Sequence, residues 1–166
     1  HEGDPELATT EMGPLILPRE AERVAAWVDE ARTGGADIWC GGERRGETRY
    51  APTVVYAPPA GCRLATSEVF GPVTTVVPYD DWQDAVVAAN NVPWSFQAAV
   101  FTENLTRAHA IAGALDAAAV MVNDHTAFRV DWMPFAGRRA SGLGIGGILD
   151  TFHDLRAQKL IVTHTV

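Results

Sequence analysis

Residues 68–77 read Glu68-Val69-Phe70-Gly71-Pro72-Val73-Thr74-Thr75-Val76-Val77 and join a constrained turn to an apolar strand. Pro72 has no amide hydrogen and fixes its own φ, while Gly71 gives the backbone freedom directly before it. The turn therefore presents the Glu68 carboxylate and the Phe70 ring in a restricted geometry. Spacing alone also fits a solvated turn carboxylate beside a core phenylalanine, so both interpretations remain open at this point.

Amphipathic helices and apolar strands alternate on both sides of this stretch. The period of the small apolar residues predicts helices at 18–34, from a cap at Asp80 to Asn90, at 103–115 and at 150–158. Short apolar runs predict strands at 36–40, 50–56, 73–77, 98–101 and 119–122. Continuously apolar strands are typical of sheets covered on both faces. We therefore expect an α/β fold with a layered α/β/α arrangement and a mostly parallel sheet.

The composition sets the class of protein. A chain of 166 residues that is 47% hydrophobic can bury one core. Its net charge of −8 argues against binding to nucleic acid or to an anionic membrane, because both need clustered cations. No apolar run approaches the length of a membrane span, and two cysteines fit a reducing compartment, so a cytoplasmic location is expected. The first residue, His1, is not methionine, which suggests a trimmed or partial chain.

Candidate reactive groups are sparse. Cys40 and Cys62 have no base or ligand partner at a useful spacing, so structural roles are favoured for both. The histidines show no metal-binding spacing, and no metal site is expected. Residues 142–147 match the G-x-G-x-x-G pattern of dinucleotide-binding turns. That pattern should follow a strand directly and precede an acidic residue about twenty positions on, and neither condition is met.

The segment 123–147 lacks periodicity but is rich in glycine and aromatic residues, which is typical of a functional loop. Within it, His125, Asp124 and Arg129 could contact an anion or a substrate. A salt bridge inside the loop is the alternative explanation.

An ordered set of motifs resembles the NAD(P)-dependent aldehyde dehydrogenase superfamily. They occur in the family's order over nearly the whole chain: Glu11-Met12-Gly13-Pro14-Leu15-Ile16, Gly41-Gly42, Ala51-Pro52-Thr53-Val54, Glu68 to Val73, Ala99-Val100-Phe101-Thr102, Val122-Asn123, Pro134-Phe135 and Ser141-Gly142-Leu143-Gly144. The segment 123–131 looks most like the branch acting on lactaldehyde, phosphonoacetaldehyde or, without phosphorylation, glyceraldehyde 3-phosphate.

The resemblance implies roles for individual residues. Glu68 would accept hydrogen bonds from the hydroxyls of the nicotinamide ribose, and Phe70 would pack near the nicotinamide of NAD or NADP. The wall of the aldehyde pocket would comprise His125, Phe128, Arg129 and Phe135. Arg129 would bind an anionic substrate group, because a guanidinium offers paired donors. The choice between NAD and NADP depends on residues outside this chain.

In the family, the nucleophilic cysteine, the general-base glutamate and the nucleotide-binding domain all precede the residues matched here. The resemblance therefore implies that residues 1–158 are part of a catalytic domain, with no catalytic residue of its own and no activity alone. Residues 159–166 would be a C-terminal strand that joins the oligomerisation sheet of a homo-oligomer. The alternative is a truncated relative that acts as a non-catalytic binding or oligomerisation module.

Four positions depart from the family pattern. Ser95, Ala118 and Ala136 stand where glycine is usual, and Arg139 stands where lysine is usual. If the family's glycines at these three positions have a positive φ, the side chains of Ser95, Ala118 and Ala136 would strain the backbone by about 1 kcal/mol or more.

Overall fold

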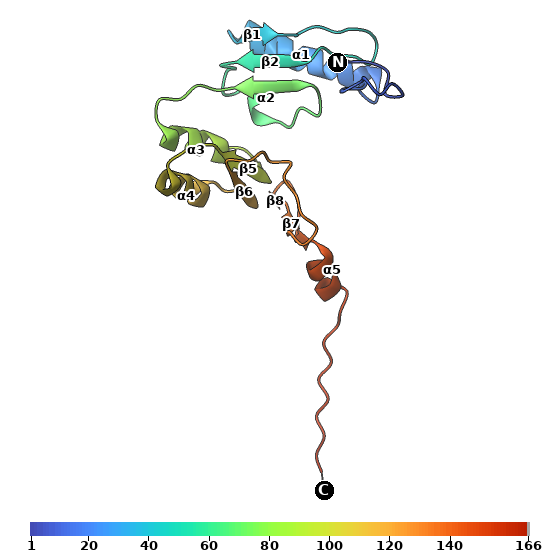
Figure 1. The fold of residues 1–166 in the computed structure, drawn as a ribbon, viewed down its shortest axis with the longest axis vertical. Coiled ribbons are helices and arrows are strands. Elements are labelled where there is room, and N and C mark those ends of the chain that lie inside the picture. Colours follow the sequence, from blue (N-terminus) through green and yellow to red (C-terminus); the bar gives the residue numbers. More distant parts are fainter. Residues whose placement is uncertain (166) are drawn as a thin grey trace. The chain divides into compact units, whose positions relative to one another are not determined.

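The computed structural model describes residues 1–165 and has a mixed α/β fold (Figure 1). The chain forms two compact units, residues 1–80 and residues from 81 onward, called unit 1 and unit 2 below. Val166, the last residue of the expected C-terminal strand, lies outside the described residues. No helix within residues 1–165 is long and apolar enough to cross a membrane.

Unit 1 packs one long helix on a small mixed sheet. Its elements are α1 (Pro18–Thr33), β1 (Asp37–Cys40), β2 (Thr53–Tyr56), α2 (Arg63–Thr66) and β3 (Val73–Val76). The sheet has the order β1-β2-β3, with β1 antiparallel and β3 parallel to β2. Strand β3 follows directly from the Phe-Gly-Pro turn, so this sheet fixes where the turn lies.

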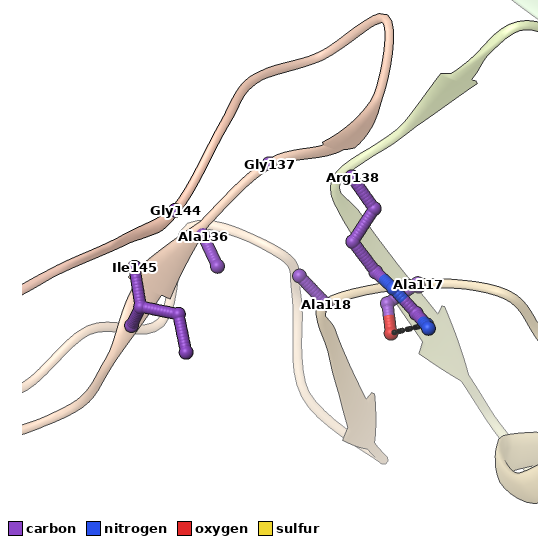
Figure 2. A pocket seen from close by; sticks show the side chains of 7 residues that line it. All are labelled: Ala117, Ala118, Ala136, Gly137, Arg138, Gly144 and Ile145. Atoms are coloured by element: carbon purple, nitrogen blue, oxygen red, sulfur yellow. Dashed lines mark hydrogen bonds between the residues drawn. The ribbon is translucent and has the colours of Figure 1, made fainter.

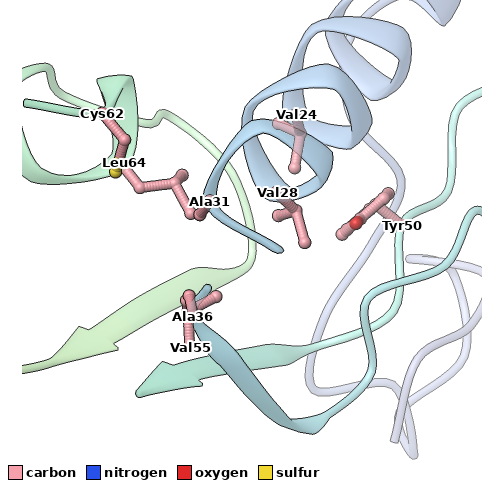
Figure 3. Close-up of a cluster of buried hydrophobic side chains, with 8 residues drawn as sticks. All are labelled: Val24, Val28, Ala31, Ala36, Tyr50, Val55, Cys62 and Leu64. Atoms are coloured by element: carbon pink, nitrogen blue, oxygen red, sulfur yellow. The ribbon is translucent and has the colours of Figure 1, made fainter. Parts of the chain in front are cut away.

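The core of unit 1 confirms the helical stripe that the sequence predicts. Pro18 occupies the first turn of α1, and Val24, Val28 and Ala31 are fully buried. These side chains pack in a cluster with Val55 and the ring of Tyr50 (Figure 3). Burying each valine contributes about 1.5–3 kcal/mol relative to leaving it exposed. Helix α1 is therefore held in place by its buried side chains, and the neighbouring segments pack against it.

The strands of unit 1 are less covered than the sequence predicts. Along β2, Thr53 and Val55 are buried while Val54 and Tyr56 are only half-buried, as expected for a strand with one face on the core. On the other face, Tyr56 stacks on the exposed ring of Trp39 with 4.5 Å between ring centroids. The expectation of cover on both faces is wrong for β3, whose residues alternate between half-buried and exposed.

Unit 2 contains shorter elements. They are α3 (Trp82–Asn90), β4 (Trp94–Ser95), β5 (Gln97–Val100), α4 (Leu105–Ala114), β6 (Ala119–Val122), β7 (Phe135–Ala136), β8 (Arg138–Arg139), β9 (Ile145–Gly146) and α5 (Ile148–Asp154). Strands β5 and β6 are parallel, whereas the pairs β4-β8 and β7-β9 are antiparallel. Helix α4 connects the two parallel strands β5 and β6, as the alternation of helices and strands predicts.

Helix caps in unit 2 are supplied by short polar side chains. Asp81 caps α3, with Oδ1 accepting from the Gln83 amide at 2.9 Å. The expectation that Asp80 is the cap is wrong by one residue, because Trp82 is the first helical position and the cap directly precedes it. Asn104 caps α4 in the same way, accepting from the Arg107 amide at 2.9 Å.

Two expectations about sheets and termini are met only in part. Instead of one layered sheet, the described residues form one three-stranded sheet and three two-stranded sheets, of which only the β2-β3 and β5-β6 pairs are parallel. The final helix is displaced, covering 148–154 rather than 150–158. Residues 156–165 contain neither helix nor strand, so the expected strand from 159 is not formed within this chain.

Candidate functional site

The Glu-Val-Phe-Gly-Pro turn of unit 1 carries two exposed side chains, Glu68 and Phe70, which are separated only by Val69. Glu68 is exposed, and the Phe70 side chain is 76% exposed. Phe70 has a φ of 43°, in the left-handed region that a bulky residue rarely adopts. An aromatic residue that is both strained and exposed contributes little to the core, so the interpretation of Phe70 as a core residue is wrong.

Three contacts hold this turn in place. A Cβ on Gly71 would lie 2.7 Å from Cγ2 of Val24, so α1 approaches the turn too closely for any side chain there. The Val73 amide donates to the Gly71 carbonyl at 2.8 Å, and the Thr53 amide donates to the Pro72 carbonyl at 2.8 Å. The turn is therefore fixed between α1 and the start of the β2-β3 ladder.

In unit 2, Asn123 begins the segment 123–147, which the sequence predicts to be a functional loop. Asn123 has a φ of 57° directly after β6. Its Oδ1 accepts from the Thr102 amide at 2.8 Å, and its Nδ2 donates to the Thr102 carbonyl at 3.0 Å. This pair of bonds ties together the chain just beyond the carboxyl ends of β5 and β6. The loop that follows therefore leaves the parallel strands from a defined position.

The predicted loop residues fall into two small groups. The His125 amide donates to Oδ1 of Asp124 at 2.7 Å, and the Phe128 amide donates to the His125 carbonyl at 3.1 Å, so His125 and Phe128 belong to one turn. The His125 side chain lies 3.9 Å from the Asp124 carboxylate. Both His125 and Phe128 are exposed.

Arg129 belongs to an aromatic group. Its guanidinium carbon lies 4.7 Å from the centroid of the Phe135 ring, within cation–π range. Phe135 in turn meets Phe96 edge-to-face, with centroids 4.9 Å apart. Within residues 1–165, no carboxylate forms an ion pair with Arg129. The alternative of a salt bridge between Asp124 and Arg129 is therefore not what this loop forms.

A cavity of about 390 Å³ lies beside this loop region in unit 2 (Figure 2). Its walls are mostly glycine and alanine; the lining residues are Ala117, Ala118, Ala136, Gly137, Arg138, Gly144 and Ile145. Arg138 is the one charged residue of this lining, and its Nη1 contacts the Ala117 carbonyl at 3.4 Å and Asp116 Oδ1 at 2.7 Å. Since its charge is already paired, this cavity has no free cation for a ligand.

The three departures from glycine do not strain the backbone as the sequence predicts. Among residues 1–165, the non-glycine residues with positive φ are Ala57, Phe70, Asn123 and Arg139, so Ser95, Ala118 and Ala136 are free of this strain. Ser95 instead makes two specific bonds, from its Oγ to the Asp116 carbonyl at 2.5 Å and from its amide to Ser141 Oγ at 3.0 Å. Arg139 has a φ of 53° and donates to the Asn90 and Val92 carbonyls.

The remaining reactive side chains form no site of their own. Cys62 is buried in the core of unit 1, whereas Cys40 is exposed with its Sγ 3.7 Å from the Pro52 carbonyl. No group of three or more potential metal ligands occurs in the part of the chain that the structure describes.

One neighbour of the turn was missed by sequence reasoning. Arg23 on α1 donates from Nη2 to the Val69 carbonyl at 2.7 Å, although the two residues are 46 positions apart. The spacing of Glu20 and Arg23 could have indicated their ion pair on one helical face, but nothing local indicates the bond to Val69.

Known proteins resemble this chain in sequence. Residues 1–161 match the model of the aldehyde dehydrogenase family. The chain is 35% identical to 3-sulfolactaldehyde dehydrogenase from Priestia aryabhattai, covering 96% of this chain and 33% of that protein. It is 35% identical to lactaldehyde dehydrogenase from Methanococcus maripaludis, covering 99% of this chain and 35% of that protein.

A solved structure agrees with the fold. Glyceraldehyde-3-phosphate dehydrogenase GapN from Methanocaldococcus jannaschii, complexed with NADP, superposes with a TM-score of 0.87 at 29% identity, covering 93% of this chain and 33% of that one. The chain thus spans about a third of the length of the relatives that it matches. With a family match along nearly all of its residues, the chain belongs to the aldehyde dehydrogenase family.

Proposed function

We propose that this chain carries the nicotinamide-ribose contacts and part of the aldehyde pocket of an NAD(P)-dependent aldehyde dehydrogenase. The complete enzyme oxidises a small aldehyde to a carboxylic acid. Its nucleophilic cysteine, general-base glutamate and nucleotide-binding domain are contributed by residues outside this chain. The observation that carries the proposal is the strained, exposed Phe70 beside the exposed Glu68 in a chain of this family.

Glu68 and Phe70 suit the nicotinamide end of the cofactor chemically. An ionised carboxylate only accepts hydrogen bonds, which matches two ribose hydroxyls that both donate. The exposed ring of Phe70 offers an apolar surface beside the nicotinamide. Bound NAD or NADP supplies the hydride acceptor, and these two residues would orient it. A positive φ at a bulky residue costs about 1–3 kcal/mol, which is tolerated most often where a ligand contact depends on the geometry.

Arg129 is proposed to bind an anionic or hydroxylated group of the aldehyde. Its guanidinium is held over Phe135 and has no carboxylate partner among the described residues, so its donors are available. A planar guanidinium pairs well with phosphonate, sulfonate or carboxylate oxygens. The name of the relative 3-sulfolactaldehyde dehydrogenase supports a sulfonate or a similar anion. His125 and Phe128 would complete this wall of the pocket.

The finer architecture is also a proposal. Strands β3, β5 and β6 each keep a free edge, so each parallel pair would extend into a layered α/β/α sheet completed by other residues. In the same way, residues 159–166 would form a strand only against another subunit. Leu160, Ile161 and Val162 are 87%, 75% and 69% exposed, which supports pairing outside this chain. The same tail favours the second candidate, a non-catalytic oligomerisation module.

An activity assay separates the two candidates. The purified chain is incubated with lactaldehyde and NAD or NADP, alone and mixed with the complementary N-terminal two thirds of the Methanococcus maripaludis lactaldehyde dehydrogenase. We expect no reduced cofactor from the chain alone and measurable formation from the mixture. Turnover by the chain alone would show that a thiol of this chain is the nucleophile. A mixture that forms a stable complex without turnover would favour the non-catalytic module.

Two variants test the residue roles in that mixture. Glu68→Gln keeps the shape but replaces one acceptor by a donor, so we expect kcat/KM to fall at least tenfold, about 1.4 kcal/mol. Glu103→Gln, an exposed carboxylate of unit 2, is the matched control and should leave the rate unchanged. Arg129→Ala should reduce kcat/KM for anionic aldehydes more than for lactaldehyde. An unchanged ranking of substrates would remove Arg129 from anion recognition.

A further inference from the structure

One face of α1 carries four side chains that lie along the segment leading into the turn at residues 68–72, called the cofactor turn below. Glu20, Arg23, Trp27 and Glu30 are spaced by three, four and three residues, which places them on one side of a helix. We call these four residues the α1 clasp. Arg23 Nε pairs with Glu20 Oε2 at 2.8 Å, and the Arg23 guanidinium lies 4.7 Å from the Trp27 ring centroid.

The α1 clasp holds the segment 63–69 at both of its ends. At the first end, Glu30 pairs with the Arg63 side chain and accepts from the Arg63 amide at 3.2 Å. The Arg63 guanidinium also lies 5.6 Å from the Trp27 ring. At the second end, Arg23 Nη2 donates to the Val69 carbonyl at 2.7 Å. Trp27 therefore lies against both Arg63, at the first end of the segment, and Arg23, which binds the carbonyl at the second end.

The bond to Val69 acts on both proposed cofactor residues. The Val69 side chain packs against the buried cluster of unit 1, and its carbonyl belongs to the peptide bond with Phe70. With side chain and carbonyl both fixed, the peptide planes on the two sides of Val69 have little freedom. Glu68 precedes this anchor and Phe70 follows it with its strained φ. A strained residue persists only where its surroundings determine its conformation, and Arg23 supplies such a constraint.

We propose that Arg23 is a positioning residue for the cofactor turn: the α1 clasp fixes the Val69 carbonyl so that Glu68 and Phe70 are presented together to the nicotinamide ribose. The cofactor part of this inference rests on the function proposed above for Glu68 and Phe70. In this proposal Arg23 acts through the Val69 carbonyl and not through contact with the cofactor. Its guanidinium is partly buried, at 28% side-chain exposure, and its bond to a carbonyl is charge-assisted, which makes it stronger than a neutral bond.

The chain offers a matched control for the test. Arg19 pairs with the same Glu20, at 3.4 Å, but its side chain is 77% exposed and donates to no backbone carbonyl among the described residues. We compare Arg23→Met, which keeps an apolar stem over Trp27, with Arg19→Met. Arg23→Lys keeps the charge but loses the planar fork, so it should retain part of the effect.

The first measurement is amide hydrogen exchange by NMR in the 166-residue chain. The Val73 amide reports on the turn because it donates to the Gly71 carbonyl. In Arg23→Met we expect Val73 to exchange about tenfold faster, as for loss of a hydrogen bond to a charged group, with the Val55 amide of β2 unchanged. Arg19→Met should leave Val73 unchanged. Equal protection of Val73 in both variants would overturn the proposal.

The second measurement is titration with reduced nicotinamide mononucleotide, followed by the amide shifts of Glu68 and Phe70. We expect the dissociation constant to rise about tenfold in Arg23→Met and to stay unchanged in Arg19→Met. A loosened turn with an unchanged dissociation constant would show that Arg23 is structural only. No binding by the unsubstituted chain, together with a loosened turn in Arg23→Met, would contradict the proposed function of Glu68 while leaving the hold of Arg23 on the turn confirmed.

Discussion

Phe70 has two features that are unfavourable for the stability of a folded chain. Its left-handed φ strains the backbone, and its ring remains largely in solvent rather than in the core. The contacts around it are correspondingly strong: a carbonyl held by Arg23 on one side and a glycine packed on α1 on the other. This pattern is expected where the direction of a side chain matters for a ligand.

Gly71 gives the sharpest prediction about stability at this turn. In Gly71→Ala, the new Cβ would meet Cγ2 of Val24 at 2.7 Å, and Val24 is fully buried and cannot move into solvent. We expect unit 1 to lose about 1–3 kcal/mol of unfolding free energy, as for overpacking of a core. A urea titration followed by the NMR signals of residues 1–80 measures this loss.

Gly61→Ala is the matched control for that measurement. A Cβ at Gly61 has nothing within 4 Å, and the residue lies in the same unit. The substitution should change the unfolding free energy by no more than about 0.5 kcal/mol. Equal losses in the two variants would show that the approach of α1 to the turn is looser than the structure indicates.

The α1 clasp should respond to acid at its carboxylates. The hydrogen bond from Arg23 lowers the pKa of Glu20 below its usual value of 4.5, and the hydrogen bond from Arg63 does the same for the pKa of Glu30. A folded-state pKa below the unfolded value stabilises the fold above pH 4.5 and loses that contribution as the pH falls through the folded pKa.

We therefore expect the indole NMR signal of Trp27 to shift with a midpoint below pH 4.5. Glu20→Gln should remove the part of this shift that arises at the Arg23 end. A midpoint above pH 4.5 would contradict the direction assigned to both carboxylates.

At the scale of elements, the N-terminus of α3 shows which of two neighbouring aspartates caps the helix. Asp81 accepts from the Gln83 amide, whereas Asp80 makes no such bond among the described residues. Asp81→Ala should cost about 1 kcal/mol of the unfolding free energy of unit 2, and Asp80→Ala no more than about 0.5 kcal/mol. Denaturation followed by the indole signal of Trp82 compares the two. The reverse order would restore Asp80 as the cap.

Helices and central strands were predictable because their signals are local. The small apolar stripe of α1 follows the helical period, and β3 follows the Phe-Gly-Pro turn in the sequence itself. The two-residue strands β4, β7, β8 and β9 carry no such period. They exist because remote residues pair, as Trp94 does with Arg139, and a pattern within a few residues cannot encode that pairing.

At the scale of the whole molecule, we expect the C-terminal segment to contribute to association between chains but not to the stability of the fold. Residues 157–165 are exposed and form neither helix nor strand, so deleting 159–166 should leave the melting temperature of the chain unchanged. If this segment pairs between subunits, the deletion should also abolish any self-association. Sedimentation velocity of the full and shortened chains at matched concentrations measures this. Persistent oligomers in the shortened chain would place the interface elsewhere.

The sequence by itself determined the family, the order of the longer helices and central strands and the identity of the turn around Phe70, because these depend on residue types at short spacings. Only the tertiary structure decided the left-handed φ of Phe70, the bond from Arg23 to the Val69 carbonyl and the placement of Arg129 on Phe135 instead of beside Asp124. Arg23 and Val69 lie 46 positions apart, and such contacts arise only when packing of α1 brings the segments together.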